Sequence, residues 1–300
     1  MTGFSYRVPA TTANLGAGFD ALSLALDRYL SVTVEPAASS SIEARGLDRE
    51  LIPTSSNNLI VRVASSAAER RKRKLPAFRL VIDNQIPLAR GLGSSAAAII
   101  AGISCYEGLT KDRLTDQEIF ECAFEFEPHP DNLAGAVYGG LVASATAEDG
   151  RVLVSRLTVT EGIRPILVIP AFELSTEKAR AVLPQSYSRK DAVYNIQRSA
   201  LTIAALTTGN WPLLREAMKD RIHQPYRAPL IPGLDEILSL STTGLLGVAL
   251  SGAGPTVLAF ARNEDAESIG RVIISIFDKH GVAATPYIAN IDAEGRSRNA

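Results

Sequence analysis

The pattern of apolar and polar positions along the chain predicts a mixture of strands and helices. Alternation or short apolar runs, typical of β-strands, occur at residues 4–10, 29–36, 78–86, 139–146, 153–159, 164–172, 247–260 and 283–291. Helical periodicity occurs at residues 17–26, 58–73, 95–107, 116–127, 176–182, 191–209, 211–219, 232–240 and 265–280. Thr115 and Glu118 have the spacing of a capping box at the start of one of these helices.

The order of these segments indicates the fold class and a division of the chain. Strands and helices are mixed without a regular strand–helix–strand rhythm, which favours an α+β fold over a doubly wound sheet. A length of 300 residues is enough for two ordinary domains. Turn-rich stretches lie within residues 146–165. We therefore expect a boundary near residue 160, with domains at 1–160 and 161–300.

Composition excludes several classes of partner. The formal net charge is −1, and nothing at the level of the whole chain recommends nucleic acid or an anionic membrane. The basic run at 70–74 is interpreted as a solvated helix end, with a phosphate- or partner-binding patch as the alternative.

No apolar run approaches the roughly 20 residues that span a bilayer, and the start of the chain does not read as a signal peptide. Cys105 and Cys122 are interpreted as buried, reduced thiols, so a soluble, cytoplasmic protein is expected.

One short segment carries the first candidate chemistry. "IPLARGLGSSAAAIIAG", residues 86–102, places glycines and serines directly before an alanine-rich helix. The first N–H groups of a helix have no internal partner, so small residues there form a ready cradle for phosphate. A hydroxyl of Ser94 or Ser95 is suited to capping the helix or ligating Mg²⁺. The segment lacks the lysine of a Walker motif and is no dinucleotide fingerprint, so on its own it is also explained by capping and close packing.

Three further motifs accompany this segment. They are "VPATTANLGAGFDALSLAL" at 8–26, "FEPHPDNLAGAVYGGLV" at 126–142 and "LSGAGPTVLAF" at 250–260. Together with "PLARGLGSSAAA", they resemble the motifs of the GHMP kinase superfamily, and most closely those of its homoserine kinase branch. The resemblance implies a GHMP kinase fold. Its N-terminal domain would be similar to the second domain of ribosomal protein S5, its C-terminal domain would be ferredoxin-like, and the site would lie in the cleft between them.

The resemblance also implies an activity. It is the ATP-dependent phosphorylation of the L-homoserine hydroxyl to O-phospho-L-homoserine, a step of threonine biosynthesis. A GHMP kinase acting on another small alcohol, similar to mevalonate or to a sugar, is the alternative. A non-enzymatic module is disfavoured because the glycine–serine segment and Glu125 are both present. The oligomeric state is left open, with a homodimer as a candidate.

The resemblance assigns residues to the ATP and metal sites. Asn58 would face adenine, although it is equally suited to capping the following helix. Mg²⁺ would be ligated by Ser95, preferred over Ser94, and by one of the carboxylates Glu121, Glu125 and Glu127, of which Glu125 best matches the family position. Arg90 stands where many relatives have a small residue, and either a phosphate contact or exposure to solvent would suit it. The full cofactor-binding set is Asn58, Pro87, Ala89, Arg90, Gly91, Leu92, Gly93, Ser94, Ser95, Ala96 and Ala97.

A second set would bind the amino-acid substrate. Its members are Asn14, Asp20, His129, Asn132, Thr176, Arg180, Arg227 and Gly252, of which Asn14, Asp20 and Asn132 are also expected to be catalytic. Asn14 and Asp20 would meet the ammonium, and Asn132 would hold the reacting hydroxyl. The carboxylate would be bound by His129 and by two arginines, whose guanidinium groups can grip it with paired hydrogen bonds.

The chemical role of Asp20 stays open at this level. Asp20 either accepts the hydroxyl proton or only binds the ammonium, and the homoserine-like context favours binding. Without the resemblance, Asn14 and Asp20 are explained by a turn and a helix cap, and the two arginines by surface charge. Pro128 stands where glycine is usual beside His129, which puts the local backbone there in question.

Overall fold

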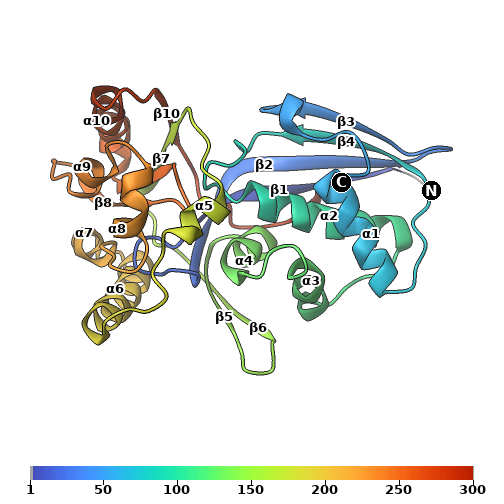
Figure 1. Ribbon diagram of the computed structural model, residues 1–300, viewed down its shortest axis with the longest axis horizontal. Helices are drawn as coiled ribbons and strands as arrows, with labels where there is room; N and C mark the ends of the chain where they lie inside the picture. Colours follow the sequence, from blue (N-terminus) through green and yellow to red (C-terminus); the bar gives the residue numbers. More distant parts are fainter. Residues whose placement is uncertain (1–2, 300) are drawn as a thin grey trace.

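A seven-stranded sheet is built mainly from the first half of the chain in the computed structural model, which describes residues 3–299 (Figure 1). Its strand order is β11-β1-β2-β4-β3, and β2 also pairs with β5, which in turn pairs with β6. β3 is parallel to β4, and the other pairs are antiparallel. The strands are β1 (Phe4–Ala13), β2 (Leu22–Pro36), β3 (Ser41–Gly46), β4 (Phe78–Asn84), β5 (Leu141–Thr146), β6 (Val152–Leu157) and β11 (Ser297–Asn299).

Helices α1 to α4 cover one face of this sheet (Figure 1). The central helix, α2, contacts β1, β2 and the other three helices. It is buried almost all round, which explains why its sequence has hardly any polar face. α3 begins with the predicted capping box of Thr115 and Glu118. The helical segments are η1 (Arg49–Leu51), α1 (Leu59–Arg70), α2 (Ser94–Thr110), α3 (Asp116–Ala123) and α4 (Pro130–Tyr138).

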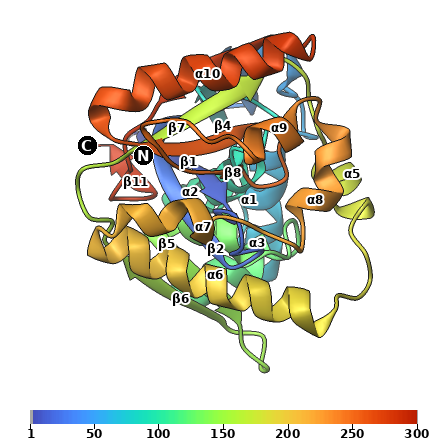
Figure 2. The ribbon, with the colours of Figure 1, turned by 90° about the vertical axis from the view of Figure 1, so that its left-hand side faces the viewer.

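A four-stranded antiparallel sheet organises the second half, with strand order β10-β7-β9-β8. Helix α10 packs on one face of this sheet, and α6 and α7 lie on its other side (Figure 2). The strands are β7 (Arg164–Pro170), β8 (Leu245–Leu250), β9 (Val257–Ala261) and β10 (Ala284–Ile288). The helical segments are α5 (Thr176–Ala181), α6 (Arg189–Thr208), η2 (Trp211–Leu213), α7 (Leu214–Ala217), α8 (Gln224–Arg227), η3 (Ala228–Leu230), α9 (Leu234–Leu238), η4 (Asn263–Asp265) and α10 (Ala266–Lys279).

The alternation of β7 divides its side chains between two hydrophobic cores. Ile166 and Val168 point into a core shared with α9 and α10. Leu167 and Ile169 belong to a second core, which is continuous with that of the first sheet. Because this core extends through both halves of the chain, the first sheet and the second sheet are packed together in a fixed arrangement. The expected α+β class is confirmed.

The helix expected at residues 17–26 is wrong. The chain turns at Asn14, Leu15 and Gly16, which all have positive φ, and then enters β2 at Leu22. The first five residues of β2 are all buried, so apolar residues occur on both faces of the strand. Because Ala25 is apolar as well, the alternation of the leucines at 22, 24 and 26 with Ser23 and Ala25 is weak, and periodicity alone does not distinguish such a short buried run from a helix.

Other differences concern short or distant elements. The sequence analysis did not predict β3, α4, α8 or β11. α3 ends at Ala123, earlier than expected, and the strand expected at 247–260 is in fact two strands joined by a turn. Within residues 3–299, no helix combines the length and the apolar character that crossing a membrane requires.

The end of the described chain returns to the first sheet. The backbone N–H of Asp292 donates to Ala25 O at 3.0 Å, and that of Gly140 donates to Asp292 O at 2.6 Å. β11 then pairs with β1, with Ser5 opposite Asn299. The division at residue 160 therefore stays a prediction, and on that division the second half contributes a strand to the first sheet.

Candidate functional site

A cavity of about 320 Å³ lies where residues from both halves of the chain meet. Its walls come from the turn after β1, the start of α2, the start of α4, the segment around α5, the end of α8 and the turn between β8 and β9. The residues expected at a ligand site that line it are Asn14, Asp20, Ala89, Gly91, Gly93, Ser94, Ser95, Ala96, His129, Asn132, Thr176, Arg180, Arg227 and Gly252. The structure thus brings together most of the predicted set.

The glycine segment reaches this cavity in a conformation that requires glycine. Gly91 and Gly93 have φ values of 75° and 68°. A Cβ on Gly93 would lie 1.9 Å from Thr11 Oγ1, and one on Gly91 would lie 2.3 Å from Ser251 O. Gly93 is the N-cap of α2, and within residues 3–299 no side chain caps this helix end. The first N–H groups of a long helix are therefore available to an anion beside Ser94 and Ser95.

A second cavity, of about 230 Å³, adjoins the first at Ser94 and Ser95, which line both. Its other walls are mainly aliphatic and come from β2, β4, α1 and the segments before α1 and α2. Asn58 lines this slot, but its side-chain oxygen accepts from Ile60 N at 3.0 Å and its amide donates to Pro53 O at 2.7 Å. An apolar slot of this kind, next to the start of a helix that can bind an anion, is suited to a nucleobase.

Four residues of the predicted cofactor set line neither cavity. Leu92 and Ala97 are buried in the core, and Pro87 is half-buried just before the glycine segment. The guanidinium of Arg90 donates to the carbonyls of Leu88, Pro170 and Ala171, at 2.8, 3.0 and 3.2 Å. Arg90 therefore ties the segment to the chain after β7, an arrangement that neither of its expected roles anticipated.

Asn14 and Asp20 face the cavity from a strained turn. Both have positive φ, at 73° and 56°. The side-chain oxygen of Asn14 accepts from Asp20 N at 3.0 Å, and its amide donates to Gly252 O at 3.0 Å. Residues outside the usual backbone regions persist where their surroundings hold them, and these two are held by each other and by the turn after β8.

Two arginines extend from the second half of the chain. Arg180 donates to both oxygens of Asp20, at 2.7 and 3.1 Å. Arg227 is almost completely buried, and its guanidinium donates to Ala179 O and Gly252 O, both at 3.0 Å. Burial, followed by the nearby charge of Arg180, lowers the pKa of Arg227 to about 10, so Arg227 still carries its charge at neutral pH.

The start of α4 supplies the remaining polar wall. Asn132 accepts from Thr11 Oγ1 at 2.7 Å, and the His129 ring contacts the carboxylate of Glu127. Asp131 is buried and accepts from Asn132 N at 2.7 Å. Burial, and then the negative charge of Asp20, raise the pKa of Asp131 to about 7. One end of the cavity therefore combines cations and carboxylates at close range.

Glu125 does not line the cavity, and its role as a Mg²⁺ ligand stays a prediction. Its side chain is exposed and accepts from Ser66 Oγ on α1 at 2.5 Å. The helical face expected to carry it does not exist, because α3 ends at Ala123. Glu127, two residues later, is the carboxylate that lines the cavity.

Four cavity residues were not expected from the sequence, namely Asp131, Leu174, Ser175 and Ala253, and Glu127 was ranked below Glu125. Glu127 and Asp131 lie within the motif "EPHPDN" that was singled out, so the signal for them was present. Leu174 and Ser175 precede α5 and have no comparable signal.

The comparisons with known proteins agree with this geometry. The family model of the GHMP kinases N terminal domain matches residues 58–140, and that of the GHMP kinases C terminal matches residues 202–279. The homoserine kinase of Solibacter usitatus is 45% identical over 292 residues, which are 97% of this chain and 96% of that protein. The homoserine kinase of Persephonella marina is 43% identical over 290 residues, covering 96% of each protein.

A solved structure extends the agreement to three dimensions. The crystal structure of homoserine kinase from Cytophaga hutchinsonii has a TM-score of 0.86 and 26% identity, covering 100% of this chain and 98% of that one. The expected GHMP kinase fold is thereby confirmed. The start of α2, the apolar slot beside it and the charged side chains of Asp20, Arg180 and Arg227 lie together within this fold. The chain belongs to the homoserine kinase family of the ATP-dependent GHMP kinases.

Proposed function

We propose that this protein transfers the γ-phosphoryl group of ATP to the hydroxyl of L-homoserine, giving O-phospho-L-homoserine and ADP, as a step of threonine biosynthesis. The observation that carries the proposal is the composition of the cavity. The start of α2 lines the cavity, and so do a carboxylate, Asp20, its ion-pair partner Arg180, and a second arginine, Arg227. These charges complement an amino acid, which brings an ammonium and a carboxylate together.

The ATP end uses the two adjoining cavities. The adenine would occupy the apolar slot lined by Asn58 and Leu59, and the phosphates would extend along Ser94 and Ser95 to the start of α2. Backbone N–H donors and the helix dipole bind phosphate without a lysine. Since Asn58 already uses both polar atoms of its side chain as a cap, its part in binding adenine would be packing.

The cavity also contains suitable ligands for Mg²⁺. A serine hydroxyl, for which Ser95 is preferred, and the carboxylate of Glu127 line the same space. Oxygen ligands are the ones that Mg²⁺ prefers, and few protein ligands are normal because this ion retains water and phosphate oxygens. The bound ion would neutralise negative charge on the phosphates during transfer. Glu127 replaces Glu125 in this proposal.

At the acceptor end, each charged group of homoserine has a counterpart. Asp20 would bind the ammonium, and Arg180 and Arg227 would bind the carboxylate, with Thr176 and His129 at the same wall. Asn132 would hold the substrate hydroxyl, because the hydrogen bond from Thr11 fixes the Asn132 side chain in position. Phosphoryl transfer has a loose transition state, so holding the hydroxyl in line with the phosphate supplies most of the rate.

The ion pair of Asp20 with Arg180 favours a binding role for Asp20. Both carboxylate oxygens of Asp20 accept hydrogen bonds from the Arg180 guanidinium, so both are already occupied as acceptors while this pair is closed. An incoming zwitterion offers each partner a new counter-ion, so both charges stay compensated when the pair opens. A neutral alcohol offers neither partner a charge, which would make this end of the site selective for amino acids.

A panel of acceptors tests the proposal. Release of ADP by the purified protein would be coupled to a spectrophotometric assay, with L-homoserine, mevalonate and galactose as separate acceptors. We expect turnover with L-homoserine and a kcat/KM at least about 100-fold lower with the other two, since they lack the ammonium. Preferred turnover of mevalonate would overturn the proposal and support a kinase for another alcohol.

A further inference from the structure

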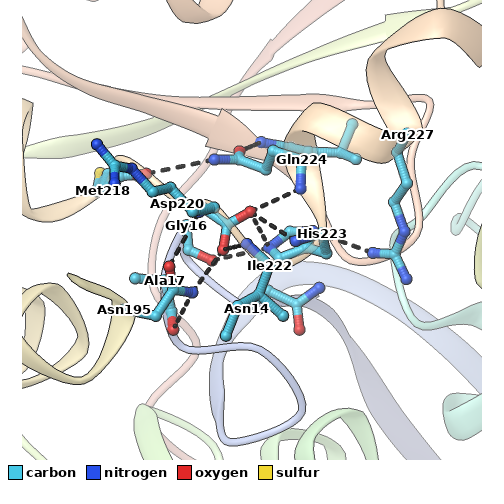
Figure 3. Close-up of polar contacts among 12 residues, drawn as sticks. Asn14, Gly16, Ala17, Asn195, Met218, Asp220, Ile222, His223, Gln224 and Arg227 are labelled. Atoms are coloured by element: carbon cyan, nitrogen blue, oxygen red, sulfur yellow. Dashed lines mark hydrogen bonds and ion pairs between the residues drawn. The ribbon is translucent and has the colours of Figure 1, made fainter. Parts of the chain in front are cut away.

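A buried polar network lies directly behind the cavity, in the segment that leads into α8 (Figure 3). Its centre is Asp220, whose side chain is fully buried. The Asp220 carboxylate accepts from the Asn195 amide at 2.6 Å and from the backbone N–H groups of Ile222, His223 and Gln224, at 3.0, 2.8 and 2.6 Å. Four donors to one buried carboxylate fix the backbone that carries His223.

The two ring nitrogens of His223 have different partners, and these partners determine the tautomer. Nε2 lies 2.8 Å from Gly16 O, which can only accept, so Nε2 carries the proton. Nδ1 lies 3.2 Å from Nη1 of Arg227, which can only donate, so Nδ1 is unprotonated. Complete burial lowers the pKa of His223, in agreement with a neutral ring.

These two contacts join separate parts of the substrate site. Gly16 belongs to the turn that carries Asn14 and Asp20, whereas Arg227 comes from the second half of the chain. The ring of Phe19, in the same turn, stacks on His223 with centroids 5.1 Å apart and an interplanar angle of 22°. His223 itself does not line the cavity. His223 therefore connects the Asn14–Asp20 turn to the Arg227 guanidinium from outside the cavity.

Arg227 depends on such contacts for its orientation. Nε and Nη1 donate to Ala179 O, Gly252 O and His223 Nδ1. Among residues 3–299, Nη2 is the one nitrogen of this guanidinium with no hydrogen-bond partner, and Arg227 lines the cavity. The partners of the other two nitrogens thus leave a single N–H₂ group for a ligand and fix its direction.

We propose that His223 is a positioning residue for the acceptor, because its neutral Nε2–H tautomer holds the Asn14–Asp20 turn and the Arg227 guanidinium in one arrangement. This inference rests on the proposed function, since it assigns Arg227 to the carboxylate and Asp20 to the ammonium of the substrate. It adds a residue outside the cavity whose loss would weaken acceptor binding and leave the nucleotide end unchanged.

Two variants separate the contact made by Nδ1 of His223 from the contact made by Nε2. His223→Asn places an oxygen near the position of Nδ1 and retains the acceptor for Arg227, whereas His223→Gln retains a donor near the position of Nε2 for Gly16. We expect His223→Gln to raise the KM for L-homoserine about tenfold or more, and His223→Asn to raise it less. The KM for ATP is expected to stay within about twofold in both variants. His280→Gln, which changes a histidine that lines neither cavity, is the control and should match the wild type.

Folding and function are kept apart in this experiment. Thermal unfolding of each variant shows whether it is folded, and a folded His223→Gln protein with a wild-type KM for L-homoserine would overturn the inference. An equal rise in the KM values for ATP and L-homoserine would also overturn it, because that result indicates a general structural loss. A wild-type protein that uses another carboxylate-bearing alcohol would overturn only the proposed function, and the same KM comparison with that acceptor would then decide the role of His223.

Discussion

Asp20 and Arg180 form a forked ion pair across the acceptor end of the cavity, with nitrogen–oxygen distances of 2.7 and 3.1 Å. Asp20 lies in the turn after β1 and Arg180 lies on α5, so the pair joins residues separated by 160 positions in the sequence. Both side chains are about one-third exposed, which leaves the pair accessible to a ligand.

Substitution Asp20→Asn should weaken acceptor binding more than it slows the chemical step. The amide cannot offset the charge of the ammonium, so we expect the KM for L-homoserine to rise about 10- to 100-fold, with a small change in kcat. Steady-state kinetics with each substrate varied in turn measures this effect. A loss confined to kcat would instead identify Asp20 as the base.

The two carboxylates Glu125 and Glu127 provide a matched comparison for the metal site. Glu127 lines the cavity, whereas Glu125 is exposed and bonded to Ser66. Glu127→Gln is expected to raise the Mg²⁺ concentration needed for half-maximal activity about tenfold or more, because one charged oxygen ligand is lost. Glu125→Gln should leave this concentration nearly unchanged. The reverse result in Mg²⁺ titrations would return the metal role to Glu125.

Gly93 should not tolerate a side chain. Gly93→Ala would place a Cβ 1.9 Å from Thr11 Oγ1 at a φ of 68°. Gly281 has a similar φ of 73° with nothing within 4 Å of an added Cβ, so Gly281→Ala isolates the cost of the backbone conformation. We expect about 1 kcal/mol of destabilisation for Gly281→Ala and more than about 2 kcal/mol for Gly93→Ala.

Nucleotide binding provides a second measurement for the same two variants. Gly93→Ala is expected to lose ATP affinity in calorimetry because the start of α2 must shift, whereas Gly281→Ala should bind ATP as the wild type does. Similar unfolding free energies and similar ATP affinities for the two variants would show that the contact with Thr11 is unimportant.

Asp131 should make the stability of the protein depend on pH. Its pKa is raised from 3.8 to about 7 in the folded state, so the unfolded chain loses this proton first as the pH rises. The free energy of unfolding therefore decreases from about pH 4 to pH 7 and then levels off. Asp131→Asn removes this penalty and should be more stable than the wild type at about pH 8, by at most about 4 kcal/mol.

Denaturant unfolding at both ends of this range tests the prediction. The difference between Asp131→Asn and the wild type should fall below about 1 kcal/mol near pH 4, where the folded carboxyl is protonated and the unfolded one is only partly ionised. A difference of the same size at about pH 4 and about pH 8 would show that the effect does not come from the titration of Asp131.

Local signals in the sequence predicted the parts of the site that depend on local structure. The glycines before α2, the cap at Asn58 and the capping box of α3 all act within a few residues, and the structure contains each of them. Glu125 was preferred to Glu127 through the resemblance, whereas the helix expected to extend to residue 127 ends at Ala123 and Glu127 is the residue that lines the cavity. The alternation of side chains changes at such a boundary, and apolar periodicity alone does not mark it.

Long-range relationships were beyond the reach of such patterns. Residues 22–26 are buried on both sides by elements distant in sequence, and a strand in that setting has the same apolar run as a helix. The network around Asp220 likewise requires Asn195, Gly16 and Arg227 to meet in the folded chain. The roles of Arg180 and Arg227 in binding the substrate were predicted through the resemblance alone, since isolated arginines have no distinctive spacing in a sequence.

The pairing of β11 with β1 affects folding during synthesis and the behaviour of fragments of the protein. During synthesis the other strands of the first sheet emerge long before Ser297–Asn299, so the outer edge of β1 at Ser5, Tyr6 and Arg7 has no neighbouring strand until β11 has been made. A fragment ending at residue 160 would carry that open edge permanently, and unpaired strand edges promote association with other chains. β11 thus covers the edge of β1 that would otherwise be open to other chains.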